Sequence, residues 1–225
     1  MNSQTTFQLG TLYLIPNTLG VYGTDGAQDT LRAVLAPQVV ETTARLQHFV
    51  VETAKVARQF LKAVGTQTPL QELQLTELNV KTPDAAVKDM LAPLLAGHDV
   101  GLLSDAGCPA VADPGARLVE AAHAADVRVV PLVGPSSLLL ALMGSGLNGQ
   151  KFAFHGYLPI DAAARLKEVK RLESESKAHA QTQLFIETPY RNMPLLDTLL
   201  KTLNANTQLC VAADLTLPSE TIRMH

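Results

Sequence analysis

Asp105 is the first residue whose type and position could do chemistry. It lies in residues 104–109 (SDAGCP), directly after the apolar run 100–104, which is typical of a buried strand. In open α/β sheets, ligands bind beyond the carboxyl ends of the strands. The small residues Ala106 and Gly107 would let a ligand approach the backbone, and the Asp105 carboxylate could bind hydroxyls or a cation. The pattern favours a ligand site, and a simple polar turn is the alternative.

Three other apolar runs end in polar loops of the same kind. Residues 134–137 (GPSS) follow one run and open a helix, which leaves backbone N–H groups free to bind a ligand. Glu187 ends a second run and Asp214 ends a third. We therefore expect four polar loops on one rim. A serine nucleophile is not expected, because the G-x-S-x-G elbow is missing.

Other motifs carry less chemistry. Gly144, Gly146 and Gly149 satisfy G-x-G-x-x-G, but a helix precedes them and a strand follows, which is the reverse of a dinucleotide site. They are interpreted as a helix stop and a turn. The six histidines are scattered, and Cys108 and Cys210 do not form a CxxC pair, so no metal site is predicted.

Strand-like and helical patterns alternate along the chain. Thr82 and Pro83 predict the start of one helix that continues to Gly97, and Asp113 is predicted to be the N-cap of the next helix. The strand that should follow residues 217–222 is missing, so we expect a truncated or alternative terminus. Strands alternating with helices indicate βαβ units, mainly parallel sheets and the α/β class. The predicted strands are residues 12–15, 48–51, 100–104, 127–132, 152–155, 183–187 and 208–213.

Composition limits the class of protein. Of 225 residues, 47% are hydrophobic and 17% charged, which is typical of a folded chain. The net charge of −3 provides no global basic field for nucleic acid or membranes, and the longest apolar run, 138–143, is too short to span a bilayer. Two cysteines and no apparent signal peptide favour a reducing, cytoplasmic setting. With 4% aromatic residues and no Trp, a stacking platform for single-stranded nucleic acid is poorly supplied.

The strings described above, in this order, resemble the tetrapyrrole methylase superfamily of S-adenosylmethionine-dependent methyltransferases. Within it the chain is most similar to the 16S ribosomal RNA ribose 2′-O-methyltransferase group. The resemblance covers nearly the whole chain. Its matching segments are residues 12–16 (LYLIP), 100–115 (VGLLSDAGCPAVADPG), 129–136 (VVPLVGPS), 152–159 (FAFHGYLP), 185–191 (FIETPYR) and 211–223 (VAADLTLPSETIR).

The resemblance implies two α/β domains, residues 1–115 and 116–225, with S-adenosylmethionine folded in the cleft between them, usually in a homodimer. It also implies a set of cofactor contacts, carried over position by position. These are Pro16 and the loop after it, Asp105, Ala106, Gly107, Ser136, Tyr157, Leu158, Pro159, Ala212, Asp214, Leu215 and Thr216.

The chain departs from the family pattern where the substrate would bind. The family's E-D-T-R is Glu52-Thr53-Ala54-Lys55 here, so an aspartate is lost and an arginine becomes lysine. Asp161 replaces the usual Lys after the GYLP segment, although Arg165 supplies the next basic position. Tyr190 stands where His is common. These changes and the net charge weaken the case for the same RNA substrate.

Methyl transfer to a hydroxyl needs alignment and a base. Glu52, Asp105 and Glu187 are candidate bases, and the hypothesis is that Asp105 serves the cofactor while Glu52, aided by Lys55, faces the acceptor. Three functions stay open. They are an RNA ribose methyltransferase, favoured by the basic stretch Arg165, Lys167, Lys170 and Arg171; a methylase of a small molecule such as a tetrapyrrole; and a cofactor-binding protein without turnover.

Overall fold

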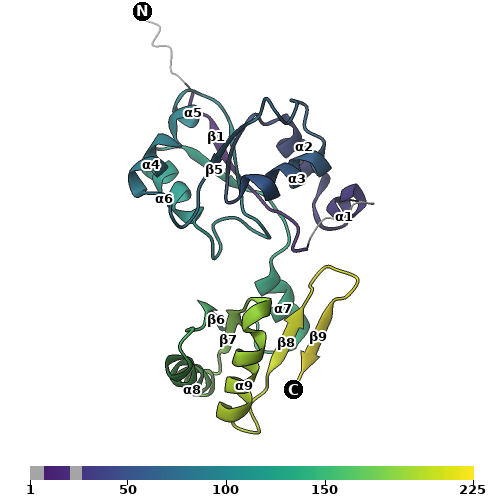
Figure 1. Ribbon diagram of the computed structural model, residues 1–225, viewed down its shortest axis with the longest axis vertical. Coiled ribbons are helices and arrows are strands. Elements are labelled where there is room, and N and C mark those ends of the chain that lie inside the picture. Colours follow the sequence, from purple (N-terminus) through teal and green to yellow (C-terminus); the bar gives the residue numbers. More distant parts are fainter. Residues whose placement is uncertain (1–7, 21–26) are drawn as a thin grey trace, which may run out of the picture. The chain divides into compact units, whose positions relative to one another are not determined.

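The computed structural model describes residues 8–20 and 27–225, and the chain divides into two compact units, residues 1–136 and 137–225 (Figure 1). The elements of the first unit are β1 (Thr11–Ile15), α1 (Ala27–Val34), α2 (Pro37–Arg45), β2 (His48–Val51), α3 (Ala54–Val64), β3 (Gln74–Glu77), α4 (Asp84–Asp89), α5 (Ala92–Leu95), β4 (Val100–Leu103), α6 (Ala116–Ala124) and β5 (Arg128–Pro131).

The first unit is a parallel sheet covered on both faces. Its strand order is β3-β2-β4-β1-β5, and every neighbouring pair is parallel. Phe49 and Phe60 belong to a core formed with α1, α2 and α3, and Leu94 and Leu118 belong to a second core formed with α4, α5 and α6. Figure 1 shows these two groups of helices on opposite sides of the sheet. The predicted α/β class is confirmed, and the carboxyl ends of all five strands share one edge.

The division after Ser136 corrects the domain boundary expected at Gly115. Residues 116–136 contribute α6 and β5, and β5 pairs with β1 at the edge of the first sheet. In α6, Leu118 is fully buried against the core of the same sheet. The turn residues of the loop at 104–115 are visible in the sequence and suggested a domain boundary there. The pairing of β5 with β1 joins segments far apart in the sequence, so it could not be seen before the structure.

The second unit has two small sheets. Its elements are α7 (Ser137–Ser145), β6 (Phe152–Tyr157), α8 (Ala162–His179), β7 (Thr182–Ile186), the 3₁₀ helix η1 (Pro189–Arg191), α9 (Asn192–Thr202), β8 (Cys210–Ala213) and β9 (Thr221–Met224). Strands β6 and β7 are parallel, and Val169 of α8 and Leu199 of α9 lie in the same core.

The observed strands correct two expectations. Strand β9 pairs antiparallel with β8, so residues 217–222 lead into a strand of this chain rather than only a polar loop. The four polar strand ends also do not share one rim. Asp105 and Gly134 follow strands of the first sheet, whereas Glu187 follows β7 and Asp214 follows β8, in two other sheets.

The helix predicted from Thr82 to Gly97 is two short helices, α4 and α5. Pro93 stands at the start of α5 and has no N–H to donate to the carbonyl of Asp89, so a continuous helix cannot form. The apolar stripe is nevertheless buried, since Val87 and Leu94 both lie in the second core. Among the described residues, no helix has the length and apolar character needed to cross a membrane.

Candidate functional site

The loops after β1 and β4 are tied together by Asn17. Its side chain is 1% exposed, and its Nδ2 donates to the carbonyl oxygens of Ser104 and Asp105 at 3.2 and 3.1 Å. The Asn17 backbone N–H donates to the Gly107 carbonyl at 2.8 Å, and the Gly107 N–H donates to the Thr18 carbonyl at 3.3 Å. This paired arrangement fixes the backbone on both sides of Asp105.

The Asp105 carboxylate has a donor of its own. Thr53 Oγ1 donates to Asp105 Oδ2 at 2.7 Å, which is the length of a charge-assisted hydrogen bond. The backbone N–H of Asp105 donates to Glu52 Oε2 at 3.1 Å. Two successive residues after β2 therefore hold the side chain and the backbone of the residue after β4.

Glu52 lies in an environment that favours its neutral form. Burial raises the pKa of its carboxyl most, and the charges of Asp105 and Asp113 raise it further, against the lowering effect of the Asp105 N–H bond. Burial also raises the pKa of Asp113, although its carboxylate accepts the Gly115 N–H at 2.6 Å. Three carboxyl groups thus share one strand-end region, and burial together with their negative charges favours the neutral form of Glu52.

The loop at residues 105–115 adopts a strained backbone. Gly107 has φ of 67°, which glycine tolerates, but Ala110 and Ala112 have φ of 66° and 59°, where a Cβ is unfavourable. Asp113 is not the N-cap that was predicted, because α6 begins at Ala116 after an N-cap at Gly115. Its carboxylate instead closes a turn within the loop. Such strain persists where the surroundings fix the backbone, and it is concentrated at functional sites.

The loop after β5 packs against the same group. A Cβ on Gly134 would lie 2.2 Å from the Cβ of Pro16, so only glycine fits here without displacement. Cys108 donates its S–H to the Pro135 carbonyl at 3.4 Å, and burial raises the pKa of its thiol. The structure thus brings together, in the first unit, the loops after β1, β2, β4 and β5.

Most predicted residues of the first unit lie in these loops. Pro16 is buried, Ala106 is exposed and Gly107 is buried beside the paired loops. Lys55 lies in the first turn of α3, three residues after Glu52, and is exposed. Ser136 follows Pro135 at the end of the first unit.

Glu187, a predicted base, is bound to an arginine in the second unit. Its Oε2 lies 2.9 Å from Arg191 NH2, and both side chains are largely buried. Arg191 NH2 also donates to the Leu158 carbonyl at 2.6 Å, and Glu187 Oε1 accepts the Thr188 N–H at 2.9 Å. These contacts give Glu187 a positioning role toward the segment that follows β6.

The basic stretch of α8 is not a free cationic face. Arg165 is 8% exposed, and it donates to the Ile160 carbonyl at 2.8 Å and to Thr198 Oγ1 of α9 at 3.0 Å. Arg171 is exposed but pairs with Glu168 and Glu175 on the same helix. Two of the four basic residues that favour an RNA substrate in the sequence are therefore engaged by other groups of the chain.

The remaining predicted contacts lie around β6 and β8. Tyr157 is 53% exposed at the end of β6, whereas Leu158 is 2% and Leu215 is 8% exposed. Asp214 and Thr216 have φ of 54° and 73°, so the loop after β8 is strained in the same way as the loop after β4. Ala212 is partly buried within β8, and Pro159 is partly buried after β6.

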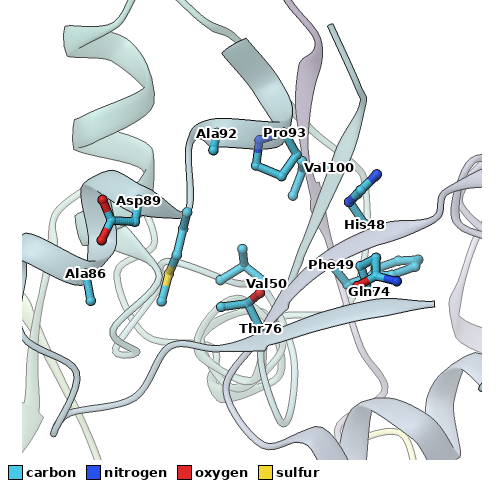
Figure 2. Close-up of a pocket in the computed structure, with 11 residues that line it drawn as sticks. His48, Phe49, Val50, Gln74, Thr76, Ala86, Asp89, Ala92, Pro93 and Val100 are labelled. Atoms are coloured by element: carbon cyan, nitrogen blue, oxygen red, sulfur yellow. The ribbon is translucent and has the colours of Figure 1, made fainter. Parts of the chain in front are cut away.

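A cavity of about 590 Å³ lies in the first unit, away from the strand-end loops. Figure 2 shows it between α4, α5 and the amino-terminal parts of β2, β3 and β4, with His48 and Gln74 on the strands and Asp89 on α4. Burial lowers the pKa of His48, and the neighbouring His98 lowers it further. Because none of the residues that line the cavity belongs to the loops around Asp105, the cavity is separate from that site.

Sequence reasoning missed Thr53 and named Asn17 only as part of a loop. Thr53 was seen as the loss of a family aspartate, whereas the structure gives its hydroxyl a bond to Asp105. A buried polar residue directly after a strand end, as at Asn17, is the signal that could have indicated a loop-fixing role. The partner of Thr53 could not be found, because it lies far away in the sequence.

A family model and several known proteins are similar to this chain, and they agree on one family. The family model described as Tetrapyrrole (Corrin/Porphyrin) Methylases matches residues 25–224. Proteins named ribosomal RNA small subunit methyltransferase I are 31% identical in Xylella fastidiosa, 34% in Mesorhizobium japonicum and 30% in Escherichia coli O157:H7. The matches cover 94–95% of this chain and 66–71% of those proteins, so the chain spans about two thirds of their length.

Two solved structures share the fold. The methyltransferase CobJ superposes with a TM-score of 0.62 at 18% identity, over 96% of this chain and 86% of that one. Uroporphyrin-III-C-methyltransferase from Thermus thermophilus gives a TM-score of 0.52 at 20% identity, over 96% and 82%. The resemblance drawn from the sequence strings is confirmed.

Proposed function

Because the chain belongs to the tetrapyrrole methylase family of methyltransferases, we propose that it transfers the methyl group of S-adenosylmethionine to a ribose hydroxyl of small-subunit ribosomal RNA. The observation that carries this proposal is the fixed Asp105 carboxylate, bonded to Thr53 and placed on a strained loop at the carboxyl end of β4. The names of the relatives support the RNA substrate.

The residues of the first unit fit a cofactor with hydroxyl groups and a positive sulfonium. Asp105 supplies a negative charge whose position is set by Thr53, and Ala106 is small and exposed, so a ligand can reach the backbone. We assign Asp105, Ala106, Gly107 and Pro16 to cofactor binding. The predicted contacts of Ser136, Tyr157, Leu158, Pro159, Ala212, Asp214, Leu215 and Thr216 are part of the same proposal.

Glu52 is the base in this proposal. S-adenosylmethionine supplies an electrophilic methyl carbon and a neutral thioether leaving group. The Glu52 carboxylate takes the proton of the acceptor hydroxyl as that oxygen forms its bond to the methyl carbon and the carbon–sulfur bond breaks. The raised pKa of Glu52 suits this step, since it makes the carboxylate a stronger base than that of an ordinary glutamate. Lys55, exposed nearby on α3, is assigned to the acceptor phosphate rather than to proton transfer.

Two further features belong to the proposal. Met193, Leu196 and Leu200 are 66%, 39% and 73% exposed on one stretch of α9, and this apolar surface supports a homodimer. A ribosomal RNA substrate places the protein in the cytoplasm.

The test uses labelled S-adenosylmethionine with small-subunit ribosomal RNA from cells that lack the gene. Label in RNA is expected, and Asp105→Ala should abolish cofactor binding in calorimetry, while Glu52→Gln, which keeps an acceptor for the Asp105 N–H, should preserve binding and lose transfer. Equal loss of binding in both variants would contradict the division of roles. Label in a tetrapyrrole instead of RNA would contradict the substrate and favour a small-molecule methylase.

A further inference from the structure

Two tyrosines are exposed in the second unit, Tyr157 at the end of β6 and Tyr190 in η1. Tyr157 is 53% and Tyr190 is 82% exposed. Each is the chain neighbour of one partner in the hydrogen bond between Arg191 NH2 and the Leu158 carbonyl. This bond links the two backbone segments that carry the tyrosines, although these segments are far apart in the sequence.

The segment after β6 is held by two arginines. Arg165 donates to the carbonyls of Pro159 and Ile160 at 3.4 and 2.8 Å, and Arg191 donates to that of Leu158 at 2.6 Å. Three successive carbonyls thus accept bonds from buried or largely buried guanidinium groups. Arg191 is itself fixed by the ion pair with Glu187 at 2.9 Å. A backbone held in this way loses little conformational entropy when a ligand contacts its side chains.

The backbone before Tyr157 directs this residue outward. Gly156 has φ of +64°, and the register of β6 with β7 shifts between Phe154 and Tyr157. A shift of this kind turns a side chain away from the regular alternation of a strand. Leu158, the next residue, is 2% exposed and anchors the segment in the core, which leaves the Tyr157 ring on the surface.

The second unit lacks the net negative charge of the first. The second unit has nine basic and eight acidic residues, whereas residues 1–136 have nine and thirteen. On α8, which starts directly after this segment, Lys167 and Lys170 are exposed, and neither is paired with a carboxylate in the described part of the chain. Lysines in such positions can contact phosphates, while tyrosine rings can stack on unpaired bases.

We propose that the rings of Tyr157 and Tyr190 form a stacking surface for unpaired bases of the RNA substrate, while the backbone of residues 157–159 keeps the role toward the cofactor that the proposed function gives it. This inference rests on that proposed function for the identity of the substrate. The low content of aromatic residues, 4% with no Trp, argued against a stacking platform for single-stranded nucleic acid. Two exposed rings on a rigid support are sufficient, because each ring can stack on one base whatever its sequence.

The chain has no Trp, so a single Trp introduced at either position gives a specific optical signal. Tyr190→Trp and Tyr157→Trp are titrated with a single-stranded RNA oligonucleotide of mixed sequence, and the fluorescence is expected to be quenched on stacking. His179→Trp, at the exposed last turn of α8, is the control and should keep its fluorescence. The same RNA annealed to its complement should quench the Tyr-derived variants much less, since its bases are already stacked.

Affinity gives the second readout. Tyr190→Ala should bind the single-stranded RNA about 5- to 150-fold more weakly, while Tyr190→Phe should bind within about twofold of the unmodified chain. Affinity for S-adenosylmethionine, measured in parallel, should be unchanged in both. If the unmodified chain binds no S-adenosylmethionine, the proposed function fails. If it binds the cofactor and RNA but Tyr190→Ala loses no RNA affinity, or the duplex quenches equally, the stacking surface is wrong.

Discussion

Replacing Thr53 by Val removes the hydroxyl that donates to the Asp105 carboxylate. Val keeps the shape of Thr but cannot donate, so the 2.7 Å bond to Oδ2 is lost and little else changes. Asp105 keeps its backbone position, because Glu52 and Asn17 bind its N–H and its carbonyl. The variant therefore frees the carboxylate without moving the loop.

The expected loss of affinity for S-adenosylmethionine follows from the rotamer populations of the Asp105 side chain. Without the bond, Asp105 can occupy about three χ1 rotamers, of which one has the observed orientation. Apparent affinity for S-adenosylmethionine should then fall at least about threefold, because only that fraction is competent to bind. The bond itself contributes about 1.5 kcal/mol to folding, at the lower end for a charged acceptor, because Asp105 is only half-buried. If that contribution is needed in full in the complex, the loss of affinity reaches about tenfold.

Calorimetry with S-adenosylmethionine and urea unfolding, done on the same preparations, separate the two effects. Thr53→Ser is the matched control, since it keeps the hydroxyl and should bind within about twofold of the unmodified chain. An unchanged dissociation constant for Thr53→Val, accompanied by lower stability, would refute the orienting role and leave Thr53 a purely structural residue.

Three other perturbations test the site and its support. Burial and neighbouring carboxylates raise the pKa of Glu52 above its value in the unfolded chain, so the folded chain loses stability as rising pH ionises this carboxyl. Glutamine stays neutral, so the thermal midpoint of Glu52→Gln should match that of the unmodified chain at about pH 4 and exceed it at about pH 7. Gly134→Ala would place a Cβ 2.2 Å from the Cβ of Pro16, and we expect weaker S-adenosylmethionine binding in calorimetry together with a lower thermal midpoint; normal binding would show that the loop can move freely. Arg165→Met removes the donor to buried Thr198 Oγ1 and to the Ile160 carbonyl and should cost about 2–4 kcal/mol in urea unfolding, whereas Arg171→Met on the exposed face of the same helix should unfold like the unmodified chain; equal losses would contradict the contrast in burial.

Local patterns predicted the class of the fold and one part of the site. The run at residues 100–103 is buried throughout as β4, and Asp105 lies at its carboxyl end as expected. Strand runs and turn residues are properties of a few neighbouring positions, so they can be recognised in a sequence without knowing what packs against them. The prediction of one continuous helix from Thr82 to Gly97 was wrong at Pro93, because it gave the apolar periodicity more weight than a helix-breaking proline that the sequence shows.

The sequence by itself determined the alternation of strands and helices and the polar loops after the strands, because period and turn chemistry are encoded locally. Only the tertiary structure decided that Thr53 binds Asp105, that β5 belongs to the first unit, and that Arg165 is buried while Tyr190 is exposed. Each of these depends on which distant segment packs against a residue. Contacts of that kind follow from the burial of whole faces and from strand order, and the types of the individual residues do not reveal them.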